Sequence, residues 1–172
     1  MSSILTEEFL LWQGRFVQTC AYVELCAFNV VSAYYEDFPE LNKRYLSENT
    51  DWIKVRKGNF ELKKNFKMCA NHIGGETGKS MFLLLKRVES AEMLRHMLVH
   101  GNWKRSKDGS GFQVQYYYDA SNKKEPSNWQ EYGWSEKQKI FTLSEIISYT
   151  HSAQEVYNEL GEIFRKIVRQ EI

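Results

Sequence analysis

The segment LRHMLVHGNW, residues 94–103, marks the point at which the chain changes character. Before it, apolar residues recur every three or four positions from Met81 onward, which predicts an amphipathic helix that ends just after His100. Gly101 suits the left-handed position that commonly follows a helix. Arg95 falls on the apolar stripe, where a charged side chain is costly unless a partner or a function holds it.

The N-terminal part of the chain predicts one long helix. Thr6 followed by Glu7 and Glu8 is typical of a helix start, because a hydroxyl can cap the first amides and acids suit the positive end of the dipole. An apolar stripe then continues to Tyr34. Pro39 ends the pattern, since the residue before a proline leaves the helical region.

A second helix is predicted over residues 60–73, and the glycines at 74–75 end it. The helix that closes at His100 should then begin near Thr77. Residues 39–59 are ambiguous, because they hold a short helix-like run and a turn-like run. These segments together favour a helical bundle.

Residues 102–141 differ from the rest. Within them, 112–118 alternate apolar and polar residues at the strand period, so we expect a β-hairpin-like insertion between two helices. Thr142 and Glu145 then form a T-x-x-E capping box, which predicts a last helix to about Arg169. The predicted fold is all-α: a four- to five-helix up-and-down bundle with this insertion before the last helix.

Size and composition bound the class of protein. A chain of 172 residues, 42% of them hydrophobic, is expected to form a single domain over 1–172 with a real core. A net charge of +1 gives no global basic footprint, so any nucleic-acid site must be local. Three cysteines without a CxxC pair argue against a disulfide framework or a zinc knuckle.

The N-terminus shows no basic region leading into an apolar one, so no secretory signal is predicted. The most apolar stretch, residues 20–35, is interrupted by Glu24 and Asn29 and is expected to be too short to cross a bilayer. We therefore expect a soluble, cytoplasmic protein that does not associate with a membrane.

The stretch GGETGKS, residues 74–80, superficially resembles a phosphate-binding loop. That loop requires G-x-x-x-x-G-K-[ST], and here Ile73 stands where its first glycine should be. The stretch also follows a helix-like segment instead of a strand. We interpret it as a glycine-rich turn between two helices.

Two further patterns leave alternatives open. Glu92, His96 and His100 recur every four residues, and on a helix such a row could offer ligands to a divalent metal in a small metalloenzyme. The insertion interleaves aromatic and cationic residues, which suits single-stranded nucleic acid but equally suits packing of a hairpin onto the bundle. These residues are Lys104, Arg105, Lys107, Tyr116, Tyr117, Tyr118, Lys123, Lys124, Trp129, Tyr132 and Trp134.

An all-helical domain that carries Arg95, His96 and His100 at the end of its third main helix resembles the HEPN superfamily, whose signature is R-x4-6-H. The resemblance covers the whole chain as architecture and one hexapeptide as motif. It implies a metal-independent endoribonuclease of a toxin, antiphage or RNA-processing system, without cofactors, acting as a homodimer with a composite site. RNA and, in toxin systems, an antitoxin protein are the implied partners. Some toxins of the family have R-x4-H-x-Y, and Asn102 departs from that form.

The resemblance assigns roles that fit the chemistry of these side chains. His100 would act as general base or acid, and Arg95 would hold the phosphate through its two-pronged guanidinium. His96 would orient the substrate. We expect substrate contacts from the residues that follow directly, namely Asn102, Trp103, Lys104 and Arg105. The main alternative is a non-catalytic HEPN-like module that binds RNA or protein.

Overall fold

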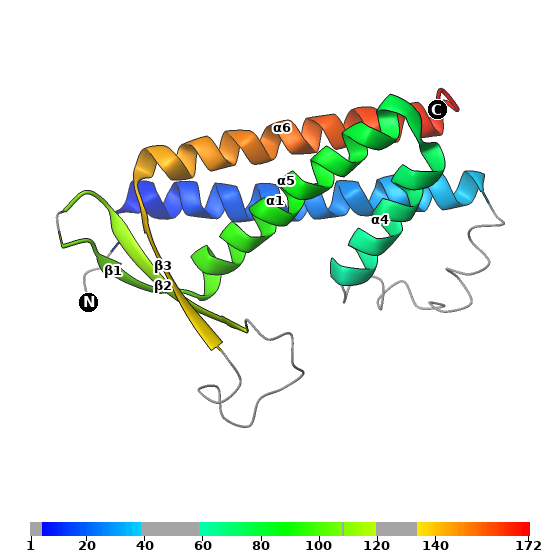
Figure 1. Cartoon of the computed structure of the whole chain (residues 1–172). Coiled ribbons are helices and arrows are strands. Elements are labelled where there is room, and N and C mark those ends of the chain that lie inside the picture. The colour runs from blue at the N-terminus through cyan, green and yellow to red at the C-terminus, as the bar shows by residue number, and fades with distance from the viewer. Residues whose placement is uncertain (1–4, 39–58, 108, 120–133) are drawn as a thin grey trace. The chain divides into compact units, whose positions relative to one another are not determined.

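The computed structural model describes residues 5–38, 59–107, 109–119 and 134–172. Within them it contains four helices, α1 (Glu7–Asp37), α4 (Asn59–Ile73), α5 (Gly75–His100) and α6 (Leu143–Val168). It also contains three strands, β1 (Asn102–Arg105), β2 (Phe112–Asp119) and β3 (Trp134–Phe141), all before the last helix (Figure 1). The prediction of a mostly helical protein with a β insertion before its final helix is confirmed.

The predicted helix starts are confirmed by their hydrogen bonds. The Phe9 amide donates to Thr6 Oγ1 at 3.2 Å at the start of α1. At the start of α6, the Glu145 amide donates to Thr142 Oγ1 at 3.2 Å, and the Thr142 amide donates to Glu145 Oε2 at 2.9 Å. This reciprocal pair is the capping box that the T-x-x-E pattern predicted.

The chain divides into two compact units. Unit 1 comprises Met1–Val17 and Glu92–Thr150, and unit 2 comprises Gln18–Ala91 and His151–Ile172. Unit 1 therefore holds the sheet, the first turns of α1 and α6, and the last turns of α5.

Unit 2 is a helical assembly around an apolar core. Parts of α1, α5 and α6, together with α4, supply its buried side chains, among them Val30, Phe66, Met81 and Leu160. Across the surface of this unit, Arg87 of α5 contacts Glu159 at 2.5 Å and Glu155 at 3.3 Å on α6.

A tight turn joins α4 to α5 in unit 2 (Figure 1). Gly74 and Gly75 both have positive φ, 66° and 55°, which glycine adopts without strain. Helix α5 begins directly at Gly75, two residues earlier than predicted. A Cβ on Gly78 would lie 2.4 Å from the Ala70 carbonyl oxygen, so this glycine lets α5 approach α4 closely. Gly74 alone thus forms the turn between the two helices, and residues 75–80, which were expected to belong to the turn in part, are the first turns of α5.

Unit 1 contains a three-stranded antiparallel sheet in the order β1-β2-β3. The register pairs Trp103 with Val114 across β1 and β2, and Val114 with Lys139 across β2 and β3. Strand β1 was not predicted, because four residues are too few to show an alternating pattern. A turn links β1 to β2. In this turn the Gly111 amide donates a hydrogen bond to Oγ of the buried Ser106 at 3.0 Å.

The sheet packs against the first turns of α1 through aromatic side chains. The Phe9 ring lies edge-on to Trp103 at 5.5 Å and to Phe112 at 4.7 Å between centroids. Phe9, Val114 and Phe141 are fully buried. The insertion is therefore part of the core of unit 1, with Phe9 at the centre of the contact.

Helix α1 requires a correction to the sequence interpretation. The apolar stretch was expected to be too short to span a bilayer, yet α1 has 31 residues and contains an 18-residue window of mean hydropathy 1.3. By length and composition alone it qualifies as a candidate membrane span. A core helix of a soluble protein has the same properties, and 39% of that window is buried inside the protein.

Several sequence predictions fall outside the described residues. These are the ambiguous segment from Pro39 onward to residue 58, and the aromatic and cationic side chains Lys123, Lys124, Trp129 and Tyr132. Tyr116, Tyr117, Tyr118 and Trp134 belong to the backbone of β2 and β3, and their side chains are likewise outside the description.

Candidate functional site

The residues of the R-x4-H motif lie on the last turns of α5, within unit 1. His96 and His100 are exposed, and Arg95 is half-buried. The stripe on which Arg95 lies is otherwise apolar, and Leu98 on it is 1% exposed. The prediction that Arg95 lies where an apolar residue would be expected is confirmed.

The two histidines of this segment lie against each other. Their ring centroids are 4.5 Å apart with an interplanar angle of 53°. This contact follows from their spacing, because residues four apart stand above one another on a helix.

The environment favours the neutral form of His96. Partial burial lowers its pKa from the ordinary value of 6.5, and the charges of His100 and Arg95 lower the pKa further. The Glu92 carboxylate acts in the opposite direction. His96 is therefore suited to accept a proton at neutral pH.

Arg95 and His100 leave the helix in different directions. Five residues correspond to a rotation of about 140° around an α-helix, so the two side chains do not share a face of α5. Around the helix axis, His96 lies between these two residues, and the charges of both lower its pKa. In a single copy of the chain, the side chains of the motif are therefore spread around the end of α5.

The end of α5 is fixed by side chains from elsewhere in unit 1. The Leu98 carbonyl, one of the last four in the helix, accepts the Gln13 side-chain amide at 2.7 Å and the Trp103 indole N–H at 3.3 Å. These two donors replace the backbone partner that a helix end lacks. They hold the turn that carries His100.

Gly101 has a different role from the predicted one. It does not have a positive φ, so it is no left-handed cap. Instead, a Cβ at this position would lie 2.1 Å from Val114 Cγ2 and 2.6 Å from the Met97 carbonyl oxygen. Glycine is required because the chain passes directly from α5 into β1 while pressed against β2.

The four residues predicted to contact substrate separate into two kinds. Trp103 is half-buried, and its ring lies 5.5 Å from Phe9 and 5.9 Å from Phe141 between centroids. It acts as a packing and positioning residue in unit 1. Asn102, Lys104 and Arg105 are exposed on β1.

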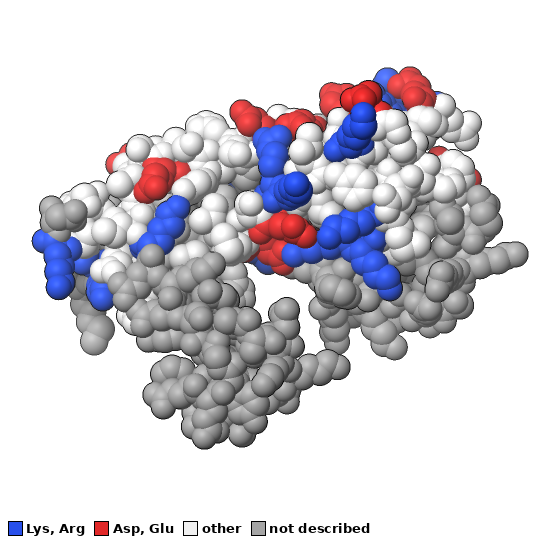
Figure 2. Space-filling model, viewed as in Figure 1, with Lys and Arg blue, Asp and Glu red and all other residues white. Residues whose placement is uncertain are grey.

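Cationic side chains gather around this strand. Lys104, Arg105 and Lys107 are all exposed within four residues of sequence. Figure 2 shows Lys and Arg atoms grouped at the end of the unit where β1 and its turn lie. Exposed positive charge is therefore present on the strand that follows the motif, with Lys104 and Arg105, as successive residues of β1, on opposite faces of the sheet.

The row Glu92, His96 and His100 does not assemble into a metal site. In the part of the chain that the structure describes, no group of three or more His, Cys, Asp or Glu side chains is placed to hold a metal ion. Cys69, another candidate ligand by type, is buried, and burial raises the pKa of its thiol to about 12. It is therefore held in the thiol form, whereas metals bind the thiolate.

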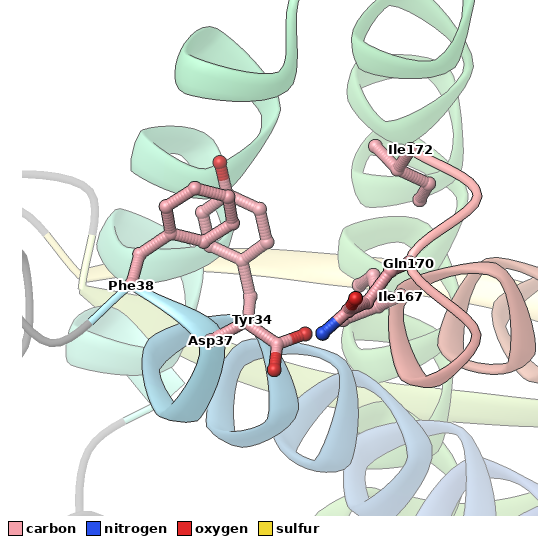
Figure 3. A pocket seen from close by; sticks show the side chains of 6 residues that line it. All are labelled: Tyr34, Asp37, Phe38, Ile167, Gln170 and Ile172. Atoms are coloured by element: carbon pink, nitrogen blue, oxygen red, sulfur yellow. The ribbon is translucent and has the colours of Figure 1, made fainter.

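A separate pocket of about 170 Å³ lies in unit 2. It is lined by Tyr34, Asp37, Phe38, Ile167, Gln170 and Ile172. In Figure 3 the Asp37 carboxylate and the Gln170 amide point toward one another, beside the rings of Tyr34 and Phe38. The lining has a carboxylate and no cation, so it offers nothing to hold a phosphate.

No protein-family model, curated protein or solved structure matches the chain. Sequence reasoning missed Gln13, which caps the end of α5 from 85 residues away, and no local pattern signals such a contact. It also missed Gln113 and Gln115, whose significance depends on the register of the sheet.

Proposed function

We propose that this protein is a metal-independent endoribonuclease of HEPN type, acting in the cytoplasm as a homodimer in a toxin, antiphage or RNA-processing system. The observation that carries the proposal is the contact between the exposed His96 and His100 rings at the end of α5. Two adjacent imidazoles beside an arginine are the groups that cleavage of RNA without a metal requires.

The chemistry needs one group to take a proton and another to give one. The 2′-hydroxyl attacks the adjacent phosphorus, its proton goes to a base, and the departing 5′-oxygen receives a proton from an acid. His96, with its lowered pKa, suits the role of base. His100, 4.5 Å away between ring centroids, suits the role of acid.

Arg95 supplies the electrostatic part of the mechanism. Its guanidinium can donate two parallel hydrogen bonds to phosphate oxygens and stabilise the charge that builds up on them. Its half-buried position lowers the dielectric around it and strengthens that interaction. Lys104, on the strand that follows the motif, adds exposed positive charge for a flanking phosphate.

A second copy of the chain would complete the site. Arg95 and His100 diverge by about 140° around the helix, so partners from another copy bring the missing side chains to one phosphate. Met93 is 47% exposed and Val99 50% exposed, and both flank the histidines on α5. They offer apolar surface for this association.

The test is cleavage of single-stranded RNA by the purified protein in excess EDTA. His100→Ala and Arg95→Ala are expected to lower the rate by at least about a hundredfold, the usual scale for an acid–base or oxyanion-stabilising group. His151→Ala, an exposed histidine on α6 in unit 2, is the matched control and should retain full activity. Cleavage that requires added metal, or that survives His100→Ala, would refute the proposal.

The second candidate is a non-catalytic HEPN-like module that binds RNA or protein. The exposed cations of β1 favour it, because they can hold a strand of RNA whether or not it is cut. This candidate predicts RNA binding without cleavage, unaffected by His100→Ala and Arg95→Ala but reduced by Lys104→Glu. An antitoxin, if the protein is a toxin, would co-purify with it and suppress its cleavage of RNA.

A further inference from the structure

One face of the sheet in unit 1 carries amide and lysine side chains. The register pairs Asn102 with Gln115 and Lys104 with Gln113 across β1 and β2. Directly paired residues lie on the same face of a sheet, and successive residues of a strand alternate between faces. Asn102, Lys104, Gln113 and Gln115 therefore share one face, which we call the amide face.

The opposite face is the one that builds the core. Val114 and Phe141 on it are fully buried, and Trp103 packs against Phe9. On the amide face, by contrast, Asn102 and Lys104 are exposed, Gln113 and Gln115 are half-buried, and the neighbouring Ile140 of β3 is 42% exposed. The amide face is consequently the accessible side of the sheet.

The dimensions of the amide face suit a nucleotide. Positions two apart on one strand are separated by about 7 Å, and neighbouring strands by about 4.8 Å. Side chains on this grid can reach one base edge together while a lysine reaches the adjoining phosphate. A short, charged edge strand also protects a sheet from aggregation, which accounts for Lys104. That function does not account for the three amides beside it.

The amide face begins at the candidate catalytic residues. Only Gly101 separates His100 from Asn102, so their Cα atoms are at most about 7.6 Å apart. This link is tight, since a Cβ on Gly101 would lie 2.1 Å from Val114 Cγ2. A strand of RNA whose phosphate lies at His100 would therefore place a neighbouring base over Asn102 and Gln115.

The side chains of the amide face are of the kind that pairs with the edges of nucleic-acid bases. Asn and Gln each present a donor and an acceptor, and they pair with two atoms of adenine at once. Bases offer these edges to proteins in single strands, whereas the grooves of duplex RNA hide them. We infer that the amide face binds the bases next to the cleaved bond of single-stranded RNA and prefers adenine there. This inference rests on the proposed ribonuclease function.

The experiment measures binding of labelled oligoadenylate, oligouridylate and a duplex RNA to the His100→Ala protein, which is expected not to cut them. Oligoadenylate should bind most tightly and the duplex most weakly. Replacing Gln113 and Gln115 together by alanine should weaken oligoadenylate binding by about tenfold or more and abolish the preference over oligouridylate. Gln154→Ala, an exposed glutamine on α6, is the matched control and should change nothing.

A second variant keeps the test independent of the glutamines. Lys104→Glu should weaken both single strands alike and reduce the salt dependence of binding, because it removes a phosphate contact. Lys166→Glu on α6 makes the same charge change at an exposed position of unit 2 and should have no such effect. Circular dichroism of each variant checks that the helices are intact.

The outcomes separate this inference from the ribonuclease proposal. If the wild-type protein cuts RNA in EDTA but the glutamine pair leaves binding and base preference unchanged, the amide face is not the base site and the ribonuclease proposal stands. If no cutting occurs but the glutamine pair abolishes a preference for oligoadenylate, the amide face binds RNA and the catalytic proposal fails. Preferential binding of the duplex overturns the inference.

Discussion

The imidazole rings of His96 and His100 lie 4.5 Å apart between centroids, one helical turn from each other at the end of α5. Neither ring is part of the core, and both are exposed. The charge of His100 lowers the pKa of His96. This coupling gives the candidate site a property that is measurable without any substrate.

The first prediction concerns the titration of His96. Its pKa is lowered from 6.5 by partial burial and by the charges of His100 and Arg95, and raised by Glu92. His100→Gln removes a positive neighbour and should raise the pKa of His96. Glu92→Gln removes the negative one and should lower it. Proton NMR titration of the ring resonances measures both shifts, and shifts in the same direction would contradict the arrangement.

The same lowered pKa links stability to pH. Because the unfolded chain binds the His96 proton more readily, the contribution of this residue disfavours the folded state as pH falls below about 6.5. At higher pH the contribution is absent. The difference in the free energy of unfolding between the wild type and His96→Gln, measured by denaturant titration, should therefore be constant above neutrality. The difference between them should change, in favour of the variant, as the pH is lowered toward 5.

The second prediction concerns Gly101. Alanine at this position would place its Cβ 2.1 Å from Val114 Cγ2 and 2.6 Å from the Met97 carbonyl oxygen, so the helix end or β2 must move. Gly101→Ala should lower the free energy of unfolding by about 1–3 kcal/mol, the usual cost of overpacking.

Gly14→Ala provides the control for this change. Gly14 lies within α1, and a Cβ there meets nothing within 4 Å. Since alanine is the better helix former, this variant should be stabilised by up to about 1 kcal/mol. Equal effects of the two substitutions on denaturant midpoints would show that the contact with β2 is not tight.

The third prediction concerns the capped carbonyl of Leu98. Trp103→Phe keeps an aromatic ring between Phe9 and Phe141 but removes the indole donor. The loss should cost about 1 kcal/mol, because the Gln13 amide still satisfies the oxygen. Trp103→Phe combined with Gln13→Ala should cost more than the sum of the two single changes. Additive losses in denaturant melts would mean that the two donors do not share this acceptor.

The fourth prediction tests dimerisation. Val99→Glu places a charge in the apolar surface beside the histidines and should convert the proposed dimer to a monomer in sedimentation experiments. Leu83→Glu is the matched control, since Leu83 is 63% exposed on the same helix but lies in unit 2. It should leave the dimer intact. A monomeric wild type, or equal effects of both variants, would count against a site shared between two copies.

Local patterns predicted the helices well because helix starts and stops depend on neighbouring residues. Thr6, Thr142 and Glu145 marked their caps, and Gly74 marked the turn between α4 and α5. The role of Gly101 could not be predicted, because the nearest atom that a Cβ there would meet, Val114 Cγ2, belongs to a strand more than ten residues later. The sequence pattern predicted only that Gly101 ends a helix, whereas the structure needs glycine there because β2 packs directly against it.

The candidate site shows the same division. The spacing of His96 and His100 predicted that they face the same way, and the sequence placed Arg95 on an apolar stripe, where the structure finds it half-buried. The amide face could not be predicted, because it depends on how Gln113 and Gln115 pair with β1. Pairing register is set by the turn and the buried face together, and neither is visible in a four-residue strand.

The most direct test of the ribonuclease proposal is the chemistry of the cut ends. Attack by the 2′-hydroxyl forms a new bond to phosphorus and expels the 5′-oxygen, which leaves a 2′,3′-cyclic phosphate on one product and a 5′-hydroxyl on the other. Mass spectrometry of RNA fragments made by the wild-type protein in EDTA should find these ends, and His100→Ala should yield none. Fragments with 5′-phosphate ends, or the same fragments from His100→Ala, would contradict the proposed mechanism.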